Sequence, residues 1–382
     1  MGQGRASILA RLNEQQAAGR RVTSSEDNPL AIIASALPLL TARDAVDLVR
    51  EHYAIEVIRA ESLVSERDQN FRLLTADGRR LVLKIANSAE APLVTDFQVR
   101  ALQHIEDYQR RHGTRFNAPR IVPATDNSPT ITITSGGRSH IVRIVTYLAG
   151  VPLGDAESSI ACCRNLGRYL AELDLGLRGF RHAGANQDLL WDMKRAPALR
   201  PLLPYISNVA LRDRVDRCLD DFEAQVLPRF DSLRWQVIHN DLNPDNVLLA
   251  AEGSPEVVGI IDFGDMLEAP LIVDLAISAS YLRRAEGDPL AGVVALVSGY
   301  HPVLPLKEPE IDLLFDLIRA RLAATISIRY WRIGERSPDD PYLQKILQEN
   351  SAESFLARLD DLPREAVSRH IRDACALQLA TA

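Results

Sequence analysis

Alternating and helical hydrophobic patterns follow one another along the chain and divide it into two parts. The first part begins with a helix over residues 42–52, for which Thr41 has the place of an N-cap. Beyond it, apolar and polar positions alternate with the period of a strand, and Ala76-Asp77-Gly78 predicts a hairpin turn between two such segments. We therefore expect an antiparallel sheet with one long helix. The strands are expected over residues 53–65, 71–75, 80–85 and 141–150, and the helix over about 93–109.

Helical periodicity dominates the second part of the chain. Leu166, Tyr169, Leu170 and Leu173 fall on one face of a helix over residues 160–174. Further helices are expected over residues 185–191, 211–227, 272–282, 291–300, 311–331, 341–359 and 364–379. The chain is thus predicted to have an N-terminal extension over residues 1–40, with a short helix near 7–18. A strand-rich lobe over 41–150 and a mainly helical lobe over 151–382 follow it.

The stretch between Val237 and Asp265 carries the chemistry. It reads His-Asn-Asp-Leu-Asn-Pro-Asp-Asn from His239, then two short strands over 247–249 and 257–261 joined by a turn, then Asp-Phe-Gly-Asp from Asp262. This spacing matches a phosphoryl-transfer site, in which Asp241 accepts a proton from a hydroxyl and Asn246 and Asp262 hold Mg²⁺. Hard cations prefer oxygen ligands, and a base must be a carboxylate close to its substrate hydroxyl.

The two halves of this stretch together resemble the aminoglycoside phosphotransferase/choline kinase family, the small-molecule branch of the protein-kinase-like fold. The loop keeps His-x-Asp and lacks the His-Arg-Asp of protein kinases. The resemblance spans about residues 55–343 and implies a two-lobed α+β fold with nucleotide between the lobes. It also implies that His239 organises the loop by hydrogen bonds and that Asp274 is structural.

A segment near the start of the expected sheet narrows the resemblance. Ser-Glu-Arg-Asp-Gln-Asn-Phe, beginning at Ser65, is similar to the corresponding loop of bacterial relatives of hydroxylysine kinase. This implies a kinase that uses ATP or GTP and phosphorylates the hydroxyl of an amino acid or amino alcohol such as hydroxylysine. The loop contains no glycine, which departs from the glycine-rich phosphate loop of protein kinases. Ser65 and Asn70 are the residues expected to line a phosphate there.

Three further predictions concern the nucleotide. Lys84, in Leu-Val-Leu-Lys-Ile, has the place of the strand lysine that holds the phosphates. Asp96, on the following helix, is its expected acidic partner, and Glu90 is the alternative. The main chain at Thr146, Tyr147 and Leu148 is expected to read the base at the hinge between the lobes.

The acceptor pocket is expected in the helical lobe near Asp241. Trp191 and Asp192 can together hold an ammonium group by cation–π and charge contacts, although a core Trp with a capping Asp fits equally well. Asp265 can face the metal or the substrate. The cluster Arg-Tyr-Trp-Arg over residues 329–332 suits either a carboxylate or a solvated helix face.

Charge and composition narrow the possible partners. The 382 residues include 44 basic and 51 acidic ones, a net charge of −7, which argues against nucleic acid and mildly favours a cationic substrate. No apolar run approaches the length of a membrane span, and no signal peptide is evident, so a cytoplasmic location is expected. The four cysteines show no metal-binding spacing, and the adjacent Cys162 and Cys163 suit helix packing. The sequence does not indicate the oligomeric state.

Two alternatives remain open. The same chemistry can act on an aminoglycoside, choline or ethanolamine, homoserine or a sugar. Alternatively, the chain is a pseudokinase that binds or regulates, as the glycine-free loop and Asp96 suggest. The complete set of Lys84, Asp241, Asn246 and Asp262 argues against a pseudokinase, because a module released from catalysis does not need all four. Magnesium-dependent phosphoryl transfer distinguishes the two classes.

Overall fold

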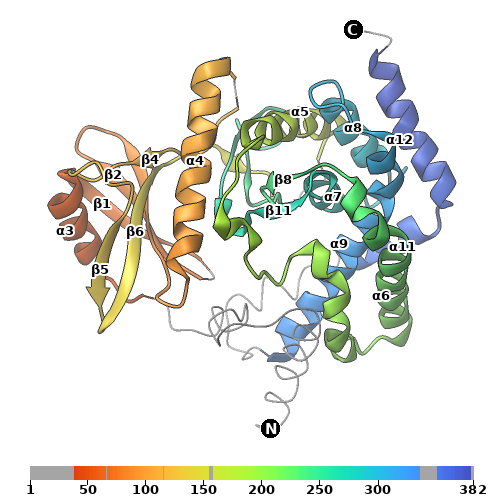
Figure 1. The fold of residues 1–382 in the computed structure, drawn as a ribbon, viewed down its shortest axis with the longest axis horizontal. Coiled ribbons are helices and arrows are strands. Elements are labelled where there is room, and N and C mark those ends of the chain that lie inside the picture. Colours follow the sequence, from red (N-terminus) through yellow and green to blue (C-terminus); the bar gives the residue numbers. More distant parts are fainter. Residues whose placement is uncertain (1–37, 66, 115, 155–157, 336–350, 380–382) are drawn as a thin grey trace.

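The computed structural model describes residues 38–379 except 66, 115, 155–157 and 336–350. Figure 1 shows a strand-rich lobe, a mainly helical lobe and the long helix α4 (Pro92–His112) standing between them. The predicted two-lobed α+β class is therefore confirmed. The expected helix at residues 7–18 lies outside the described residues, and the boundaries 1–40, 41–150 and 151–382 stay predictions.

One six-stranded sheet forms the N-terminal lobe. Its order is β1-β2-β3-β6-β4, with β5 also paired to β6, and every pairing is antiparallel. Helix α3 (Ala42–Tyr53) packs beside β1. The strands are β1 (Val57–Leu63), β2 (Gln69–Thr75), β3 (Arg80–Ile85), β4 (Ile121–Val122), β5 (Ile131–Ser135) and β6 (Arg138–Thr146).

Local sequence explains how these elements begin and turn. Thr41 caps α3 as predicted, since its side chain accepts a hydrogen bond from the N–H of Asp44 while the Asp44 carboxylate accepts one from the N–H of Thr41. The predicted hairpin between β2 and β3 turns at Gly78, whose φ of 84° a residue with a side chain rarely adopts. The sheet thereby holds residues 70, 84 and 143 side by side, because Lys84 pairs with Asn70 on one neighbour and Arg143 on the other.

Two small sheets connect the lobes and carry the predicted catalytic stretch. One contains β7 (Val151–Pro152), β9 (Val247–Leu249) and β10 (Val257–Ile260), and β9 and β10 form the predicted hairpin. The other pairs β8 (Trp235–Ile238) with β11 (Leu267–Pro270). Gly150 precedes β7 at a close approach, since a Cβ there would lie 2.8 Å from the Cβ of Leu248. The glycine thus lets the chain pass from the hinge onto β9.

Helices make up most of the C-terminal lobe. Helix α5 (Ile160–Leu177) crosses α8 (Ala291–Tyr300) at two glycines: a Cβ on Gly167 would lie 1.9 Å from the carbonyl oxygen of Leu296, and one on Gly299 would lie 1.8 Å from that of Arg164. The backbones of the two helices are therefore in direct contact. The other α-helices are α6 (Val209–Asp221), α7 (Ile272–Ser280), α9 (Glu308–Glu335), α11 (Ser351–Asp360) and α12 (Arg364–Leu379).

Some predicted helices differ from the observed ones. Residues 185–191 were expected to be helical, but only a 3₁₀ turn over Ala183–Asn186 forms there. The helix expected over 211–227 ends at Asp221 and continues as a π-turn and a 3₁₀-helix, Phe222–Val226 and Leu227–Ser232. Strands β5, β8 and β11 and a 3₁₀-helix over Met193–Tyr205 were not predicted. Part of the helix expected over 341–359 lies outside the described residues, and α11 forms its second half.

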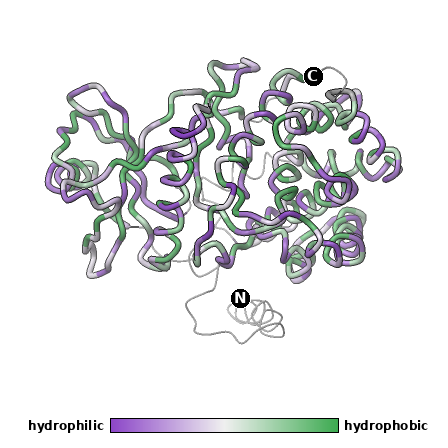
Figure 2. Tube along the Cα trace, turned by 45° about the horizontal axis from the view of Figure 1, so that its top comes forward, coloured by the Kyte–Doolittle hydropathy of each residue, from purple (hydrophilic) through white to green (hydrophobic). Residues whose placement is uncertain are grey.

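Two hydrophobic cores stabilise the molecule. The smaller one lies between α3 and the sheet, whereas the larger one fills the helical lobe and also receives Phe97, Ala101 and Ile105 of α4. Figure 2 shows hydrophobic positions concentrated along the strands and inner helices, with hydrophilic ones on the outer turns. All four cysteines are buried, and for Cys162 and Cys163 this agrees with the predicted packing role. In the described part of the chain, no helix is both long and apolar enough to cross a membrane.

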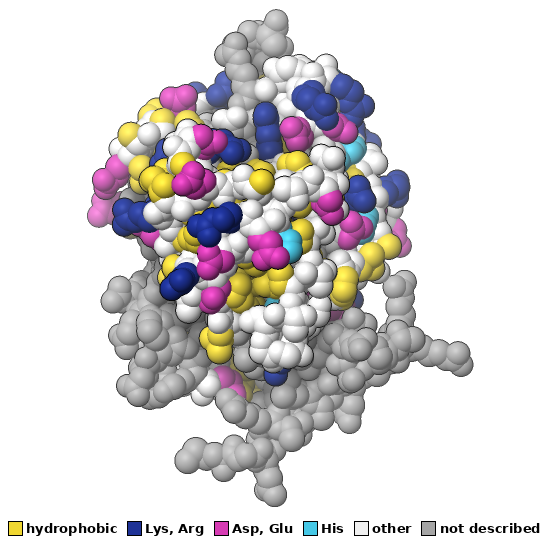
Figure 3. Space-filling model, turned by 90° about the vertical axis from the view of Figure 1, so that its left-hand side faces the viewer, with side chains coloured by type: hydrophobic (Ala, Val, Ile, Leu, Met, Phe, Trp, Pro, Cys, Tyr) yellow, Lys and Arg dark blue, Asp and Glu magenta, His cyan; other side chains and the backbone are white. Residues whose placement is uncertain are grey.

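The face of the strand-rich lobe that is turned away from the helical lobe carries side chains of both charges. Figure 3 shows basic and acidic side chains interspersed across it, together with scattered hydrophobic ones. Exposed ion pairs such as Arg72–Glu61 and Arg79–Asp77 belong to this lobe.

Candidate active site

The loop between β8 and β9 is held to helix α7 by two hydrogen bonds. Both carboxylate oxygens of Asp274, on α7, accept backbone N–H groups, from His239 at 2.9 Å and from Asn240 at 2.8 Å. Asn240 has a φ of 64°, a conformation that these bonds hold in place. The expectation that Asp274 ties the loop to a helix is confirmed.

His239 organises the same loop from inside. Its Nδ1 accepts the N–H of Asp241 at 3.3 Å, so its Nε2 is the protonated nitrogen that donates to the carbonyl of Ile261 at 3.1 Å. Its ring also meets that of Phe263 edge-on, with 4.8 Å between centroids. Burial lowers the pKa of His239, which favours this neutral tautomer. The ring therefore connects the Asp241 loop to the segment that carries Asp262.

Asp241 stands at the centre of the loop with both oxygens oriented. Asn243 donates to Oδ1 and Oδ2 at 3.1 and 3.0 Å, and Asn246 donates to Oδ2 at 2.9 Å. Burial, together with the charges of Asp265 and Asp262, raises the pKa of Asp241 to about 8. A carboxylate with such a pKa can accept a proton near neutral pH.

Asn246 and Asp262 present oxygen atoms beside Asp241. The amide nitrogen of Asn246 donates to the carbonyl oxygen and side chain of Asp241, so the amide oxygen is the atom that Asn246 can offer to a cation. Asp262 follows β10 with a φ of 61°. The positive charges of Lys84 and Arg67 lower the pKa of Asp262 to about 2, so this carboxylate is ionised.

Lys84 reaches across from the sheet to this carboxylate. Its Nζ lies 3.4 Å from Oδ1 of Asp262, which joins the two lobes at the site. Its cross-strand neighbours Asn70 and Arg143 line a cavity together with Lys84, which is described below as the sheet-side cavity. Among the described residues, Oδ1 of Asn70 and one terminal nitrogen of Arg143 are buried without a hydrogen-bond partner. These atoms are arranged for a polar ligand beside Lys84.

Asp96 occupies a different place from the one expected. It accepts a hydrogen bond from Nε2 of His182 at 3.0 Å and pairs with Arg100 at 3.4 Å, on the side of α4 that faces the helical lobe. The phase of the helix explains this, because Gln98, two residues on, points to the cleft instead. The expected Lys84–Asp96 pair is therefore not formed. Glu90, the alternative, lines a cavity together with Lys84 but accepts its hydrogen bond from Thr95, at 2.6 Å.

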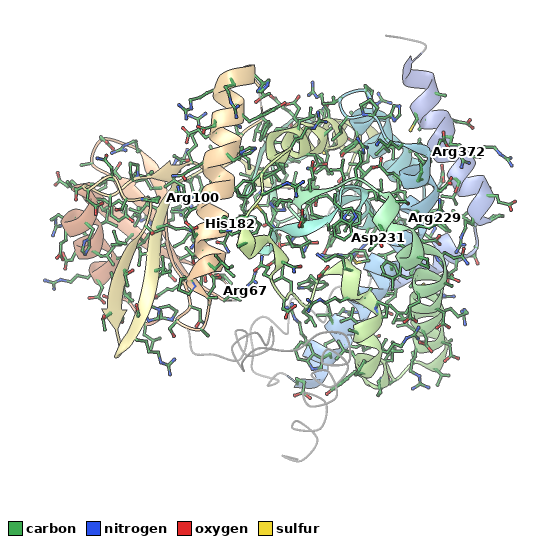
Figure 4. All side chains as sticks on the ribbon, viewed as in Figure 1. Arg67, Arg100, His182, Arg229, Asp231 and Arg372 are labelled. Atoms are coloured by element: carbon green, nitrogen blue, oxygen red, sulfur yellow. The ribbon has the colours of Figure 1, made fainter. Side chains whose placement is uncertain are left out.

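The glycine-free loop is anchored by Arg67, a residue that the sequence reading did not single out. Its guanidinium forms an ion pair with Asp265, on the segment that follows Asp262, and Figure 4 shows Arg67 at the junction of the lobes, below α4. The charge of Asp265 raises the pKa of this arginine further. The ion pair shows that Asp265 faces the β1–β2 loop, and the loop brings a positive charge close to Asp262.

A cavity of about 350 Å³, the sheet-side cavity, lies between β3, the hinge and β9. All three predicted hinge residues line it, but the N–H of Thr146 already donates to Arg120 and that of Tyr147 to Arg80. Leu148 is thus the hinge residue whose N–H can meet a base edge. The predicted Lys84, Asn70, Asn246 and Asp262 also line this cavity, along with the apolar residues Val82, Leu248 and Ile261.

A second cavity of about 250 Å³, the helix-side cavity, adjoins the first one. Lys84, Gln98 and Asp262 line both cavities. Asp241, Asp265, Trp191 and the predicted loop residue Ser65 also line the helix-side cavity. The oriented carboxylate of Asp241 and the ionised one of Asp262 therefore lie where molecules bound in the two cavities would meet.

The predicted acceptor residues have mixed outcomes. The ring of Trp191 already stacks with arginines of α9, lying 4.7 Å from the guanidinium carbon of Arg321 and 5.6 Å from that of Arg332. Asp192 is buried and accepts the N–H of Lys194 at 3.0 Å, so it caps the following 3₁₀-helix and does not line the cavity. Its expected role toward an ammonium group is therefore replaced by the alternative of a capping Asp.

Comparison with known proteins bears on this geometry. Residues 60–306, more than half of the chain, match the phosphotransferase enzyme family. The chain belongs to this family. It is also 27% identical to hydroxylysine kinase of Mus musculus over 355 residues, which cover 87% of this chain and 93% of that one.

Solved structures of phosphotransferases share the fold. An amicoumacin kinase in complex with AMP-PNP, Ca²⁺ and amicoumacin superimposes with a TM-score of 0.60 at 12% identity, over 86% of this chain and 93% of that one. An aminoglycoside phosphotransferase from Alicyclobacillus acidocaldarius has a TM-score of 0.59 at 21% identity, over 90% and 98%. A GDP and kanamycin complex of an aminoglycoside 2″-phosphotransferase reaches 0.54 at 17% identity, over 82% and 98%.

A phosphotransferase works with a divalent cation, and the residues present fit one. Asn246 offers an amide oxygen and Asp262 an ionised carboxylate, which are the donors that Mg²⁺ prefers. Within the described ranges, no three His, Cys, Asp or Glu side chains form a group that could hold a metal ion alone. This suits Mg²⁺, which usually binds through one or two protein ligands and the phosphates of a nucleotide.

Sequence reasoning missed further residues of the site, among them Arg67, Gln98, Arg143, Asn243 and Arg321. Arg143 alternates with the inward-facing residues of β6, but a single arginine in a strand gives no signal of this role. Arg321 lies on the same helical face as Arg329 and Arg332, at spacings of eight and eleven residues. Extending the noted arginine cluster back along this period would have found it.

Proposed function

We propose that this phosphotransferase transfers the γ-phosphoryl group of a nucleoside triphosphate to a hydroxyl of a small amino acid or amino alcohol, hydroxylysine among them. The observation that carries the proposal is the meeting of two cavities at Lys84 and Asp262, with the oriented Asp241 in the wall of the second. A phosphate group at the shared wall lies between a nucleotide site and an acceptor site. The identity to hydroxylysine kinase over most of both chains supports the choice of acceptor.

Each side chain has a role in this scheme. Asp241 accepts the proton of the acceptor hydroxyl, since Asn243 and Asn246 hold its oxygens in place and its pKa is raised to about 8. Lys84 and Arg143 hold the phosphates through their charge, and Leu148 meets the base through its main chain. Asn246 and Asp262 hold Mg²⁺, which when bound neutralises phosphate charge.

In the β1–β2 loop, a positively charged side chain takes the place of the glycines that bind phosphate in protein kinases. A glycine-rich loop binds phosphates through its backbone N–H groups. Here the Arg67 guanidinium, fixed by Asp265, supplies positive charge near Asp262 in their place, and Ser65 adds a hydroxyl to the cavity wall. ATP and GTP both fit this scheme, because the hinge reads the base only through its main chain. The cytoplasmic location stays a prediction.

The test is a turnover assay of the purified protein. ATP and GTP, each with Mg²⁺, are crossed with 5-hydroxylysine, ethanolamine, choline, homoserine and kanamycin, and release of nucleoside diphosphate is measured. We expect acceptor-dependent release with 5-hydroxylysine. In Asp241→Asn, kcat should fall by a factor of roughly 10² to 10⁴ while nucleotide affinity stays within a few-fold.

Other results would change the conclusion in defined ways. Turnover of a different acceptor would keep the chemistry and replace the substrate. Thermal stabilisation by nucleotide without transfer to any acceptor would favour the pseudokinase alternative. Unchanged kcat in Asp241→Asn would remove Asp241 from the role of base.

A further inference from the structure

We propose that Arg321 binds a carboxylate of the acceptor, so that the substrate is a hydroxy amino acid and amino alcohols, choline and aminoglycosides are discriminated against. The inference rests on the proposed function and specifies its substrate class. It comes from one buried guanidinium in the wall of the helix-side cavity.

Arg321 is buried but incompletely bonded. Only 1% of its surface is exposed, and it is the largest fully buried side chain in the described part of the chain. One terminal nitrogen donates to the carbonyl of Trp191 at 3.3 Å, and the guanidinium stacks on the indole ring. Its Nε has no hydrogen-bond partner in the described ranges. The stacking fixes the plane of the guanidinium and leaves donors in that plane for a ligand.

Among the described residues, no carboxylate lies within hydrogen-bond distance of this guanidinium. Its ion-pair contact there is with Asp241, whose Oδ1 lies 3.8 Å from the other terminal nitrogen. Asp241 accepts its hydrogen bonds from Asn243 and Asn246 instead. A buried charge with an unused donor is costly, and a ligand carboxylate satisfies both the charge and the donor in the geometry that guanidinium groups favour.

Further positive charge lines the same wall. Arg329 and Arg332 follow Arg321 along one face of α9, and all three line the cavity, with Trp191 between the guanidinium groups of Arg321 and Arg332. Arg329 forms an ion pair with Glu353 of α11, so Arg321 is the arginine of this wall on which the proposal rests. The strand-rich lobe contributes Asp68 and Glu90 to the cavity, where the ammonium of an amino acid can bind. A cavity with an arginine wall and carboxylates elsewhere suits a zwitterion.

The short distance between Arg321 and Asp241 restricts the acceptor further. The hydroxyl must reach Asp241 while the carboxylate reaches a guanidinium that lies 3.8 Å from it. The two groups must therefore lie close together in the bound acceptor. A hydroxy amino acid carries both groups, and a flexible side chain such as that of 5-hydroxylysine can bend to bring them together, whereas an aminoglycoside has no carboxylate.

The experiment compares acceptors that differ only in the carboxylate. The pairs are 5-hydroxylysine with 1,5-diaminopentan-2-ol, and homoserine with 3-aminopropan-1-ol. For the full-length protein with Mg²⁺ and nucleotide, we expect kcat/KM to favour the amino acid of the active pair by roughly 10- to 100-fold. In Arg321→Gln that preference should disappear through a raised KM for the amino acid, with the value for the amino alcohol nearly unchanged. Arg321→Lys keeps the charge and should retain part of the preference.

Two controls separate binding from folding and from failure of the chemistry. Arg319→Gln removes an arginine of the same helix that pairs with Asp221 and Asp360 outside the cavity; it should lower stability and leave the preference intact. Thermal shifts of the Mg²⁺–AMP-PNP-loaded protein test acceptor binding without turnover.

Each outcome decides between the possibilities. Stabilisation by the amino acid alone, lost in Arg321→Gln, supports the proposal even where no transfer is seen. Equal use or equal binding of both members of a pair by the wild type overturns the carboxylate site and leaves the kinase standing. An Arg321→Gln defect that is equal for both acceptors also overturns it, and assigns Arg321 to the transferred phosphoryl group or to the fold.

Discussion

Asp241 and Asp262 are both carboxylates of one site, yet their pKa values are displaced in opposite directions. Burial and neighbouring negative charges raise the pKa of Asp241 to about 8, whereas Lys84 and Arg67 lower that of Asp262 to about 2. A base works best with a pKa near the working pH, and a metal ligand must be ionised throughout. The two environments are therefore consistent with the proposed roles, in which Asp241 is the base and Asp262 the ligand.

Replacing Asp262 by asparagine tests the ligand role. The amide keeps the size of the side chain but removes the ionised charge, so the affinity for nucleotide in the presence of Mg²⁺ should fall at least roughly tenfold. Without Mg²⁺ the affinity should change little, since Lys84 loses its partner and stays available to phosphate. Calorimetric titration of nucleotide with Mg²⁺ and with a chelator measures both.

Asp231→Asn is the matched control, because Asp231 is exposed and lies far from Arg67 and the site (Figure 4). It should leave both affinities unchanged. If Asp262→Asn kept the full difference between titrations with and without Mg²⁺, the cation would be held elsewhere.

Which residues a sequence can predict depends on how their function is encoded. Asp241, Asn246 and Asp262 are joined by loop geometry over a short stretch, so their spacing carries the information, and the structure brings them together. Arg67 acts by meeting Asp265, 198 positions away, and no local pattern encodes that contact. The predicted contact between Asp96 and Lys84 was wrong for a similar reason, because packing decides which face of α4 is turned toward the sheet. The roles of all these residues remain predictions until tested.

At the scale of elements, hydrophobic periodicity was a good guide wherever a helix packs on one face. Helix α8 begins and ends at the predicted residues, and helix α5 begins at the predicted residue. The 3₁₀-helix over Met193–Tyr205 was missed because Pro197, Pro201 and Pro204 lack the N–H that a regular α-helix uses. Strands β8 and β11 have only four residues each, which is too short for an alternating pattern to be detected.

The α5–α8 crossing gives a prediction at this scale. A methyl group on Gly167 would lie 1.9 Å from the carbonyl oxygen of Leu296, a backbone atom that cannot move aside alone. Gly167→Ala should therefore lower the free energy of unfolding by roughly 2–3 kcal/mol, although glycine to alanine in an unhindered helix raises it by about 0.5–1 kcal/mol. Urea denaturation measures the change. Arg168→Ala, on the exposed side of the same helix, should stay within about 0.5 kcal/mol of the wild type. A Gly167→Ala protein as stable as the wild type would show that the helices can separate freely.

At the scale of the whole molecule, α4 belongs to both lobes. It stands beside the sheet in Figure 1, yet Phe97, Ala101 and Ile105 are buried in the core of the helical lobe. Asp96 adds a hydrogen bond to His182 on that side. The lobes are thus joined along α4 independently of any nucleotide, and the cleft contacts Lys84–Asp262 and Arg67–Asp265 are additional.

The Arg67–Asp265 pair should accordingly stabilise the closed cleft without being needed for folding. Its side chains are only 29% and 11% exposed, so removing one partner leaves a charge partly buried beside Asp241 and Asp262. In a double-mutant cycle of Arg67→Gln and Asp265→Asn, measured by urea denaturation without nucleotide, we expect a coupling energy of roughly 1–3 kcal/mol. Arg67→Gln alone should be the most destabilised protein of the cycle, because Asp265 then repels its acidic neighbours, and adding Asp265→Asn should recover much of the loss. Additive effects within about 0.3 kcal/mol would mean that the two side chains do not interact in solution and that the β1–β2 loop is held by other contacts. All four proteins should still unfold in one transition, since the shared core along α4 is intact in each of them.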